Sequence, residues 1–283
     1  MTTDATQGAP RSRWLVYTLL FAASIAMLYP LLWMVSSSFK PDAEIFASGS
    51  LVPKQFSLDA YVRGWSSLRV SFGRFFWNSL VVSVLCVVGN VMACSLTAYA
   101  FTRLQFAGRH FWFALMLGTL MMPQHALLIP QYVLFLHLGW VDTVLPLVVP
   151  KFLATDSFFV FLMVQFYRQI PRQLDEAAAM DGCGPWRIYF RIILPLTLPV
   201  MATAAVFSFI WTWDDFFAPL IYLNDMKSYT AQLGLRTFID SGGQSDWSAL
   251  FAMSTLTVIP VFLVFVFFQR LLIEGIATTG MKR

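Results

Sequence analysis

Long stretches without a charged side chain constrain the fold of this chain more than any other feature. Trp14–Phe39 runs for 26 residues, Phe75–Thr102 for 28 and His110–Val141 for 32 without one Asp, Glu, Lys or Arg. Ile192–Trp213 and Trp247–Gln269 add runs of 22 and 23 residues. A helix needs about 20 mostly apolar residues to cross the hydrocarbon core of a bilayer. Each of these five runs is therefore predicted to contain a membrane-spanning helix.

The composition agrees with a chain that lies mostly in lipid. Of the 283 residues, 58% are hydrophobic and only 12% are charged, and the mean hydropathy is +0.67. A soluble domain of this size has too little interior to bury that much apolar side chain. These values exclude a soluble enzyme, a nucleic-acid binder with a basic face and a disordered chain.

A sixth span is predicted between the third and fourth of these runs. Residues 146–167 contain Lys151 and Asp156, but the stretch after Asp156 is strongly apolar. The predicted fold is an all-α, polytopic membrane protein with a tail at 1–13 and a single transmembrane domain at 14–283. The six predicted spans cover about residues 14–35, 76–101, 111–135, 146–167, 193–213 and 247–269. A five-span alternative would put the two termini on opposite sides of the membrane.

The distribution of basic residues predicts the orientation of these spans, because cytoplasmic loops carry an excess of Lys and Arg. With both termini in the cytoplasm, the inside segments hold 11 basic residues and the outside loops hold 7. The inside residues are Arg11, Arg13, Arg103, Arg109, Arg168, Arg172, Arg187, Arg191, Arg270, Lys282 and Arg283. Six spans with both ends inside fit this bias best.

Several other classes of feature are missing from the sequence. The three cysteines, Cys86, Cys94 and Cys183, form no CxxC pair and predict neither a disulfide framework nor a compartment. The three histidines have no metal-ligand spacing, so no metal site is expected. The first apolar run is longer than the core of a signal peptide and favours an uncleaved span.

One inside segment, residues 168–191, carries seven charged residues in 24 positions. Residues 174–180 show the pattern of a short helix with one apolar side. Gly182 or Gly184 is expected to end it, because glycine accepts the left-handed conformation of a helix terminus. Pro185 suits the first turn of a second helix over 186–193. The segment is predicted to form two short helices joined by a glycine turn. The alternative is an ordinary amphipathic loop on the membrane surface.

The spacing of particular residues here resembles a known signature. Glu176-Ala177-Ala178 is followed after three residues by Gly182, and then by Ile192 and Leu194-Pro195. This pattern resembles the EAA–Gly–Ile–Leu-Pro signature of ABC-importer permeases at every fixed position. The chain is similar to permease subunits of binding-protein-dependent importers, in the carbohydrate-uptake branch with its maltose-type G subunits. The resemblance implies the type I ABC-importer permease fold.

Other segments extend the resemblance over nearly the whole chain. They are Ser37–Pro41, Asn78-Ser79, Ala98–Phe101, Pro123 through Pro130–Tyr132, Gly139, Ile170-Pro171, Trp213–Phe216 and Gln269-Arg270. Two positions depart from the family pattern. Cys183 stands where Ala is common and packs similarly, whereas Asp214 stands where Asn is frequent and adds a charge near the outer membrane boundary.

The resemblance implies that residues 168–191 form the coupling loop that docks on a cytoplasmic ATPase. The residues implied in this contact are Glu176, Ala177, Ala178, Asp181, Gly182, Ile192, Leu194 and Pro195. The implied partners are a second permease subunit (F-type), two ABC ATPase subunits and an extracytoplasmic solute-binding protein. The chain has no Gly-Lys dipeptide and hence no Walker A loop, so ATP and Mg are expected on the ATPase and no cofactor on this non-catalytic chain.

Polar residues inside the predicted spans are candidates for a solute pathway. They are Asn90, Gln124, His125, Gln131, Asp156, Trp213 and Asp214. The small polar stripe on the second span that contains Asn90 also fits simple helix packing. The kink at Pro123 fits either a transport site or a locally satisfied proline bend. Asp156 lies either near the middle of the fourth span or at the outer end of a span that starts later.

An ion-coupled secondary transporter is the alternative function. It accounts for six spans and for intramembrane polar groups, but not for the charged segment 168–191. An intramembrane enzyme is disfavoured because neither HExxH nor GxSxG occurs. The expected location is the plasma (inner) membrane of a bacterium or archaeon, with several membrane passes.

Overall fold

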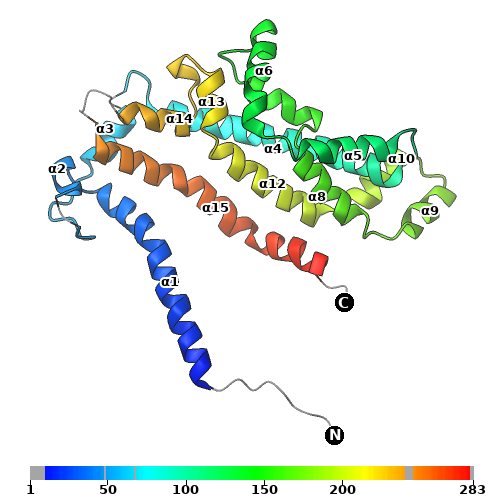
Figure 1. Ribbon diagram of the computed structural model, residues 1–283, viewed down its shortest axis with the longest axis horizontal. Coiled ribbons are helices and arrows are strands. Elements are labelled where there is room, and N and C mark those ends of the chain that lie inside the picture. Colours follow the sequence, from blue (N-terminus) through cyan, green and yellow to red (C-terminus); the bar gives the residue numbers. More distant parts are fainter. Residues whose placement is uncertain (1–9, 48, 67, 240–244, 281–283) are drawn as a thin grey trace. The chain divides into compact units, whose positions relative to one another are not determined.

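The computed structural model describes residues 10–47, 49–66, 68–239 and 245–280 (Figure 1). All regular secondary structure within these ranges is helical, in agreement with the all-α prediction. The chain separates into two compact units: a first unit of residues 1–69 and 237–256, and a second unit of residues 70–236 and 257–283. Most of the predicted tail, up to residue 9, lies outside the described residues, as do the side chains of Arg11, Arg13, Lys282 and Arg283.

The first unit consists of α1 (Pro10–Ser37), α2 (Asp42–Ile45), α3 (Asp59–Ser66) and the beginning of α15 (Trp247–Gly280). Helix α1 exposes large apolar side chains along its length, among them Met27, which is 82% exposed. A helix that is apolar all round and unburied is matched to lipid rather than to water. This agrees with the prediction that α1 is a membrane span.

Helix α4 (Phe72–Arg103) is the centre of the second unit. It packs against α8 (Ser157–Tyr167), α12 (Leu198–Trp213) and the 3-10 helix η1 (Val149–Leu153). The predicted polar stripe on α4 faces these neighbours, because Ser79, Ser83, Cys86, Asn90 and Cys94 are all buried. The hydroxyl of Ser79, for example, accepts a hydrogen bond from the Ala231 N–H at 2.8 Å. The structure therefore favours helix packing as the main role of this stripe.

The predicted third span, 111–135, is broken rather than only kinked. Helix α5 (Arg109–Thr119) and helix α6 (Gln124–His137) are separated by residues 120–123. Pro123 precedes α6 in an extended conformation, with φ −66° and ψ 117°. Proline disfavours the helical conformation of the residue before it, which accounts for the interruption. The kink predicted at Pro123 is thus a full interruption of the helix.

The predicted fourth and fifth spans also contain breaks. In the fourth, α7 (Leu145–Val148) and η1 precede α8, and Ala154 between η1 and α8 has a left-handed φ of 54°. In the fifth, the helical stretch from Pro185 to Leu196 meets α12 at 75°. The straight part of that span therefore begins at Leu198 and not at 193.

The number of spans follows from helix length and apolar character. Four described helical stretches are long and apolar enough to cross a membrane: Trp14–Ser37, Phe72–Arg103, Leu145–Tyr167 and Trp247–Arg270. The bent pair that ends in α12 makes a fifth if it is one span, and the apolar part of α6 is shorter. The predicted count of six is therefore not confirmed by helix length alone.

Short helices follow α12 in the region predicted as an outer loop. They are α13 (Phe217–Tyr222), η3 (Met226–Ser228), α14 (Ala231–Leu235) and η4 (Arg236–Phe238). Tyr222 and Leu233 are buried against Val82 and Cys86 of α4. This region is therefore a packed part of the fold rather than an extended loop.

Candidate functional site

Residues 168–191, called the coupling loop from here on after the role that the resemblance implies, fold as two short helices, as predicted. Helix α9 (Gln173–Met180) is followed by a turn at Gly182 and by α10 (Pro185–Ile188) with the π-helix η2 (Tyr189–Ile193). Gly182 has a φ of 78°. The N–H groups of Gly182 and Cys183 donate to the carbonyls of Ala179 and Ala178 at 3.0 and 2.9 Å. This pair of bonds is the Schellman arrangement, which requires a left-handed residue at the position of Gly182.

Basic residues tie the coupling loop to the end of α4. Arg103, the last residue of α4, lies 3.1 Å from Asp175 of α9 between Nε and Oδ2. The same guanidinium donates to the carbonyls of Tyr167 and Ile170 at 3.2 and 2.8 Å. Arg172 donates in return to the carbonyl of Thr102 at 3.1 Å. The start of the loop is therefore attached to the end of α4, and the same arginine of α4 also bonds to the end of α8.

Buried hydroxyl groups hold the second half of the loop. Ser95 of α4 lies 2.7 Å from the hydroxyls of both Tyr167 and Tyr189. The Tyr99 hydroxyl donates to the carbonyl of Pro185 at 3.0 Å. Tyr167 and Tyr189 are buried within the same hydrophobic cluster as α4 and α8. Hydrogen bonds of this kind fix an orientation that apolar packing alone leaves loose.

Burial also affects the carboxylate at the start of α9. Burial raises the pKa of Asp175, and the attraction of Arg103 and Arg172 offsets only part of this effect. The side chain of Arg103 is 6% exposed and that of Asp175 is 20% exposed. The pair is therefore largely screened from water and differs from an ordinary surface ion pair.

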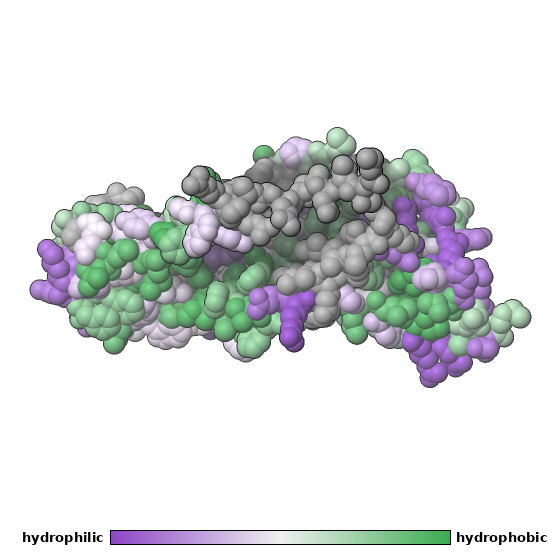
Figure 2. Space-filling model, turned by 90° about the horizontal axis from the view of Figure 1, so that it is seen from below, coloured by the Kyte–Doolittle hydropathy of each residue, from purple (hydrophilic) through white to green (hydrophobic). Residues whose placement is uncertain are grey.

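The residues of the predicted signature divide into an outer and an inner set. Glu176, Ala177, Asp181 and Gly182 are exposed, whereas Ala178 is buried against the second unit. Farther along, Ile192 and Leu194 are partly buried and Pro195 is exposed. Figure 2 shows hydrophilic residues gathered at the end of the second unit that carries α9 and α10, beside a largely hydrophobic surface along the helices.

Sequence reasoning missed the residues that position the loop. The sequence marks Arg103 only as a flanking charge and Ser95 as part of no motif, since their partners lie 64 or more positions away in the chain. A basic residue at the last position of a span was the one available signal for Arg103. No local pattern marks Ser95.

A second polar cluster lies within the helices of the second unit. Asp156 Oδ2 accepts hydrogen bonds from Asn90 Nδ2 at 2.6 Å and from Lys151 Nζ at 2.8 Å. Asn90 also donates to the Ser208 hydroxyl at 3.1 Å. The structure therefore brings together two predicted pathway residues, Asn90 and Asp156. It adds Lys151 and Ser208, which no sequence pattern connects with these two residues.

Asp156 directly precedes α8 and lies near the middle of Leu145–Tyr167, the helical stretch that is long and apolar enough to cross a membrane. The Asp156 carbonyl accepts the N–H groups of Phe159 and Val160. A carboxylate at a helix N-terminus is favoured by the helix dipole. The Asp156 and Lys151 side chains are 26% and 28% exposed, so both remain accessible from one side.

Of the other predicted pathway residues, Gln131, Trp213 and Asp214 have partners outside this cluster. The side chains of Gln124 and His125 lie outside the described residues. Gln131 accepts a hydrogen bond from the Tyr222 hydroxyl at 3.4 Å. Trp213 is 1% exposed and donates its Nε1–H to the Thr257 carbonyl, so it packs in the interior. Asp214 is exposed and lies 3.4 Å from the amide of Gln232.

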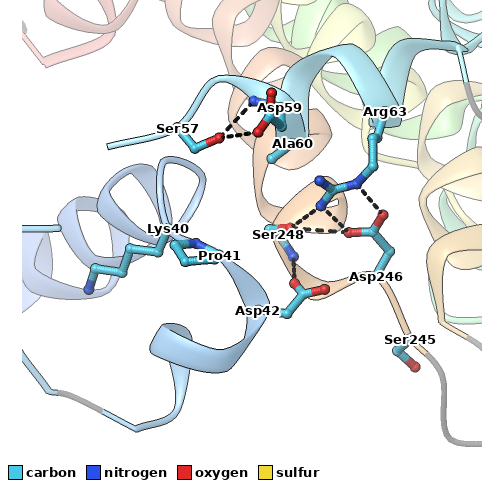
Figure 3. Close-up of a pocket in the computed structure, with 10 residues that line it drawn as sticks. All are labelled: Lys40, Pro41, Asp42, Ser57, Asp59, Ala60, Arg63, Ser245, Asp246 and Ser248. Atoms are coloured by element: carbon cyan, nitrogen blue, oxygen red, sulfur yellow. Dashed lines mark hydrogen bonds and ion pairs between the residues drawn. The ribbon is translucent and has the colours of Figure 1, made fainter. Parts of the chain in front are cut away.

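The first unit holds a polar pocket of about 530 Å³ (Figure 3). Arg63 forms a double contact with Asp246, at 3.2 and 3.3 Å, and also donates to the Ser248 hydroxyl at 2.8 Å. Asp42 accepts the Ser248 N–H at 2.7 Å. Lys40 is almost fully buried and donates to the Ser50 carbonyl, away from these carboxylates. The charged side chains of the pocket are thus already engaged, Arg63 and Asp246 by an ion pair and Lys40 and Asp42 by hydrogen bonds to neutral groups.

Metal binding has no structural support in the described part of the chain. No group of three or more His, Cys, Asp or Glu side chains there is arranged to hold a metal ion. The polar groups at both the coupling loop and the Asn90 cluster instead form hydrogen bonds and ion pairs with one another.

Several apolar helices long enough to span a bilayer, together with a polar loop bonded to their ends, are the features of a multi-pass membrane protein. The chain belongs to the family of binding-protein-dependent transport system inner membrane components, whose profile matches residues 7–278. The resemblance to importer permeases inferred from the signature is thereby confirmed.

Individual relatives support the same assignment. The chain is 32% identical over 278 residues to the probable ABC transporter permease protein YurM of Bacillus subtilis, covering 96% of this chain and 91% of that protein. It is 31% identical over 268 residues to the diacetylchitobiose uptake system permease protein NgcG of Streptomyces coelicolor, covering 94% and 88%. Neither is named as an ion-coupled transporter, so the alternative function gains no support.

A solved structure has the same fold. The crystal structure of a bacterial ABC transporter involved in the import of the acidic polysaccharide alginate contains a chain that matches with a TM-score of 0.83. The match covers 95% of this chain and 99% of that chain at 22% identity. The type I importer fold expected from the signature agrees with this similarity.

Proposed function

We propose that this chain is one of two permease subunits of an ATP-driven importer for a carbohydrate-type solute. In this proposal it forms half of the transmembrane pathway and has six spans with both termini in the cytoplasm. A second permease, a pair of cytoplasmic ATPase subunits that bind ATP and Mg, and an extracytoplasmic solute-binding protein complete the transporter. The relative named for diacetylchitobiose uptake supports a carbohydrate solute.

The attachment of the coupling loop carries this proposal. A permease without a nucleotide site must receive force through a contact with the ATPase, and a contact transmits force only if it is rigid on the permease side. Arg103, Ser95 and Tyr99 of α4 each bond to the loop or to its flanks. Glu176 and Ala177 remain exposed on α9. The small Ala177 permits close approach of a partner, and Glu176 is available to pair with a basic group on it.

The experiment uses the reconstituted transporter with its ATPase and solute-binding protein. Glu176→Lys reverses a charge at the proposed contact, and we expect solute-stimulated ATP hydrolysis and uptake to fall to background while the subunit still inserts. Normal stimulation in this variant would refute the role of the loop.

A matched pair of glycine substitutions tests whether the left-handed backbone of the turn is needed for coupling. A Cβ at either Gly182 or Gly184 meets no atom within 4 Å, but only Gly182 has a left-handed φ. We therefore expect Gly182→Ala, with a strain cost of about 1–2 kcal/mol, to lower coupled ATPase activity. Gly184→Ala should leave it near the wild-type value, and equal effects would show that the turn is unimportant.

For the solute pathway, we propose the accessible side of the Asn90–Asp156 cluster. Carboxylate, amide and ammonium groups are suitable partners for sugar hydroxyls, and polar groups at this depth are costly unless they are used or paired. We expect Asp156→Asn to leave assembly intact and to raise the solute concentration needed for half-maximal uptake. Asp156→Asn leaves the ammonium group of Lys151 without its ion-pair partner. The double variant Lys151→Gln/Asp156→Asn removes that charge as well and serves as the control. Unchanged uptake in both variants would remove Asp156 from the pathway and leave it a purely structural role.

A further inference from the structure

A basic pocket lies where α4 and α8 end and α5 begins. Its lining includes Arg109, His110, Arg168 and Arg172, together with Phe101 and Phe113, and contains no acidic residue. The cavity volume is about 80 Å³. A second hollow of about 270 Å³ adjoins it, because Arg109 and His110 line both. Three guanidinium groups around one small cavity attract an anion.

Contacts with neutral groups hold the three arginines in place. Arg109 donates to the Leu104 carbonyl at 3.2 Å and Arg172 to the Thr102 carbonyl. The Arg168 guanidinium lies over the Phe113 ring, 5.1 Å from its centroid. The nearby carboxylate of Asp175 forms its ion pair with Arg103, although Arg172 also attracts it. The charge of the pocket is therefore positioned but not neutralised by an ion pair with a lining residue.

The N-terminus of α5 adds to this field. Gly108, with a φ of 76°, precedes the 11-residue helix, and no side chain caps it. Uncapped N–H groups and the positive end of the helix dipole form an anion-binding arrangement. Both features, the helix terminus and the arginines, meet at Arg109 and His110.

The surroundings indicate which anion reaches this site. In the orientation of the proposed function, on which this inference rests, the pocket lies at the cytoplasmic ends of apolar helices, where phospholipid headgroups are found. Phe111 and Trp112 beside it are 65% and 54% exposed and offer an apolar surface to an acyl chain. Basic pockets between membrane helices on the cytoplasmic side recognise anionic headgroups. We propose that this pocket binds the phosphate of an anionic phospholipid and so anchors the start of the coupling loop to the membrane.

Native mass spectrometry of the purified transporter, with phosphatidylglycerol or phosphatidylcholine added, tests the proposal. We expect the wild-type complex to retain more phosphatidylglycerol than phosphatidylcholine. Arg109→Gln/Arg168→Gln should weaken this selective binding by about 30-fold, since each arginine contributes about fivefold near a membrane surface. Arg270→Gln, an exposed arginine on α15, is the control and should retain the lipid.

Three outcomes would overturn the assignment. They are equal retention of the two lipids by the wild-type complex, equal loss in the control and the double variant, and displacement of phosphatidylglycerol by millimolar inorganic phosphate. The last outcome would assign the pocket to a free phosphate anion. The intact mass of each complex in the same spectra confirms that all subunits are assembled.

Discussion

Arg103 combines three contacts in a place where little water reaches it. Its guanidinium meets Asp175 and two backbone carbonyls, and its side chain is 6% exposed. Removal of one member of a buried ion pair leaves the other charge without compensation. Residues of this kind affect the position of a whole segment, although they contact no ligand.

Arg103→Met is therefore expected to destabilise the second unit by about 3 kcal/mol, visible as a lower thermal midpoint of the purified complex. It should also reduce solute-stimulated ATPase activity, because α9 loses its attachment. Arg103→Met/Asp175→Leu should recover much of the thermal stability, since no buried charge remains. If the double variant is less stable than the single variant, the ion pair is not the source of the effect.

Asp246 gives a pH-dependent prediction for the first unit (Figure 3). Burial alone would raise the pKa of Asp246, but hydrogen bonds from Arg63 and from the Ala249 N–H hold the pKa below its usual range. A lowered folded pKa contributes stability above the unfolded value of about 3.9. That contribution is lost as the pH falls through the folded pKa.

We therefore expect Asp246→Asn to lower the thermal midpoint at about pH 6, and the difference from wild type to shrink as the pH approaches about 3. Asp225→Asn serves as the control for the chemical change. A difference that stays constant over this range would show that protonation of Asp246 is not involved.

At the scale of elements, close packing leaves different amounts of room for added atoms. A Cβ at Gly234 of α14 would lie 2.3 Å from the ring of Phe75, which is fully buried. A Cβ at Gly118 of α5 would meet nothing within 4 Å. The two glycines therefore provide a matched comparison.

Gly234→Ala should destabilise the second unit by about 1–3 kcal/mol, because the Phe75 ring has no free space to enter. Gly118→Ala should be neutral or stabilising by up to about 1 kcal/mol, since alanine favours a helix. Thermal unfolding of both variants provides the measurement. Equal thermal midpoints of the two variants would show that the Phe75 ring moves to admit the added methyl group at little cost.

Charge-free runs predicted the helices that are continuous, namely α1, α4 and α15. They did not predict the breaks before α6 and α8, because an apolar run looks the same whether its backbone is straight or interrupted. Pro123 marked one break, but no residue type marked the left-handed Ala154. In the coupling loop, glycine and proline predicted the local turn, whereas contacts with α4 depend on residues distant in sequence.

At the scale of the whole molecule, the orientation of the chain remains a prediction of its charge distribution. The break between α5 and α6 sharpens the question, because two helices meeting at residues 120–123 suit either one interrupted span or a segment that returns to its own side. One interrupted span would place Thr143 on the opposite side of the membrane from Gln105. A returning segment would place both residues on the same side.

Single cysteines introduced into a cysteine-free protein distinguish these arrangements. With six spans, an impermeant thiol reagent added outside intact cells should label Thr143→Cys and Lys227→Cys but not Gln105→Cys or Met180→Cys. Met180 is 89% exposed, so its failure to react would reflect its side of the membrane rather than its burial. Protection of Thr143→Cys would rule out a crossing by α5 and α6.

The attachment of α9 to the end of α4 has a consequence for exchanging parts between transporters. Asp175 and Glu176 are neighbours on one helix, so their side chains point in directions about 100° apart. Because Arg103 holds Asp175 toward α4, Glu176 is directed away from the helices and is exposed. Residues 168–191 are therefore not a self-contained cassette. A graft of this segment into another permease would need a compatible basic residue from the recipient, 72 positions upstream of the transplanted aspartate.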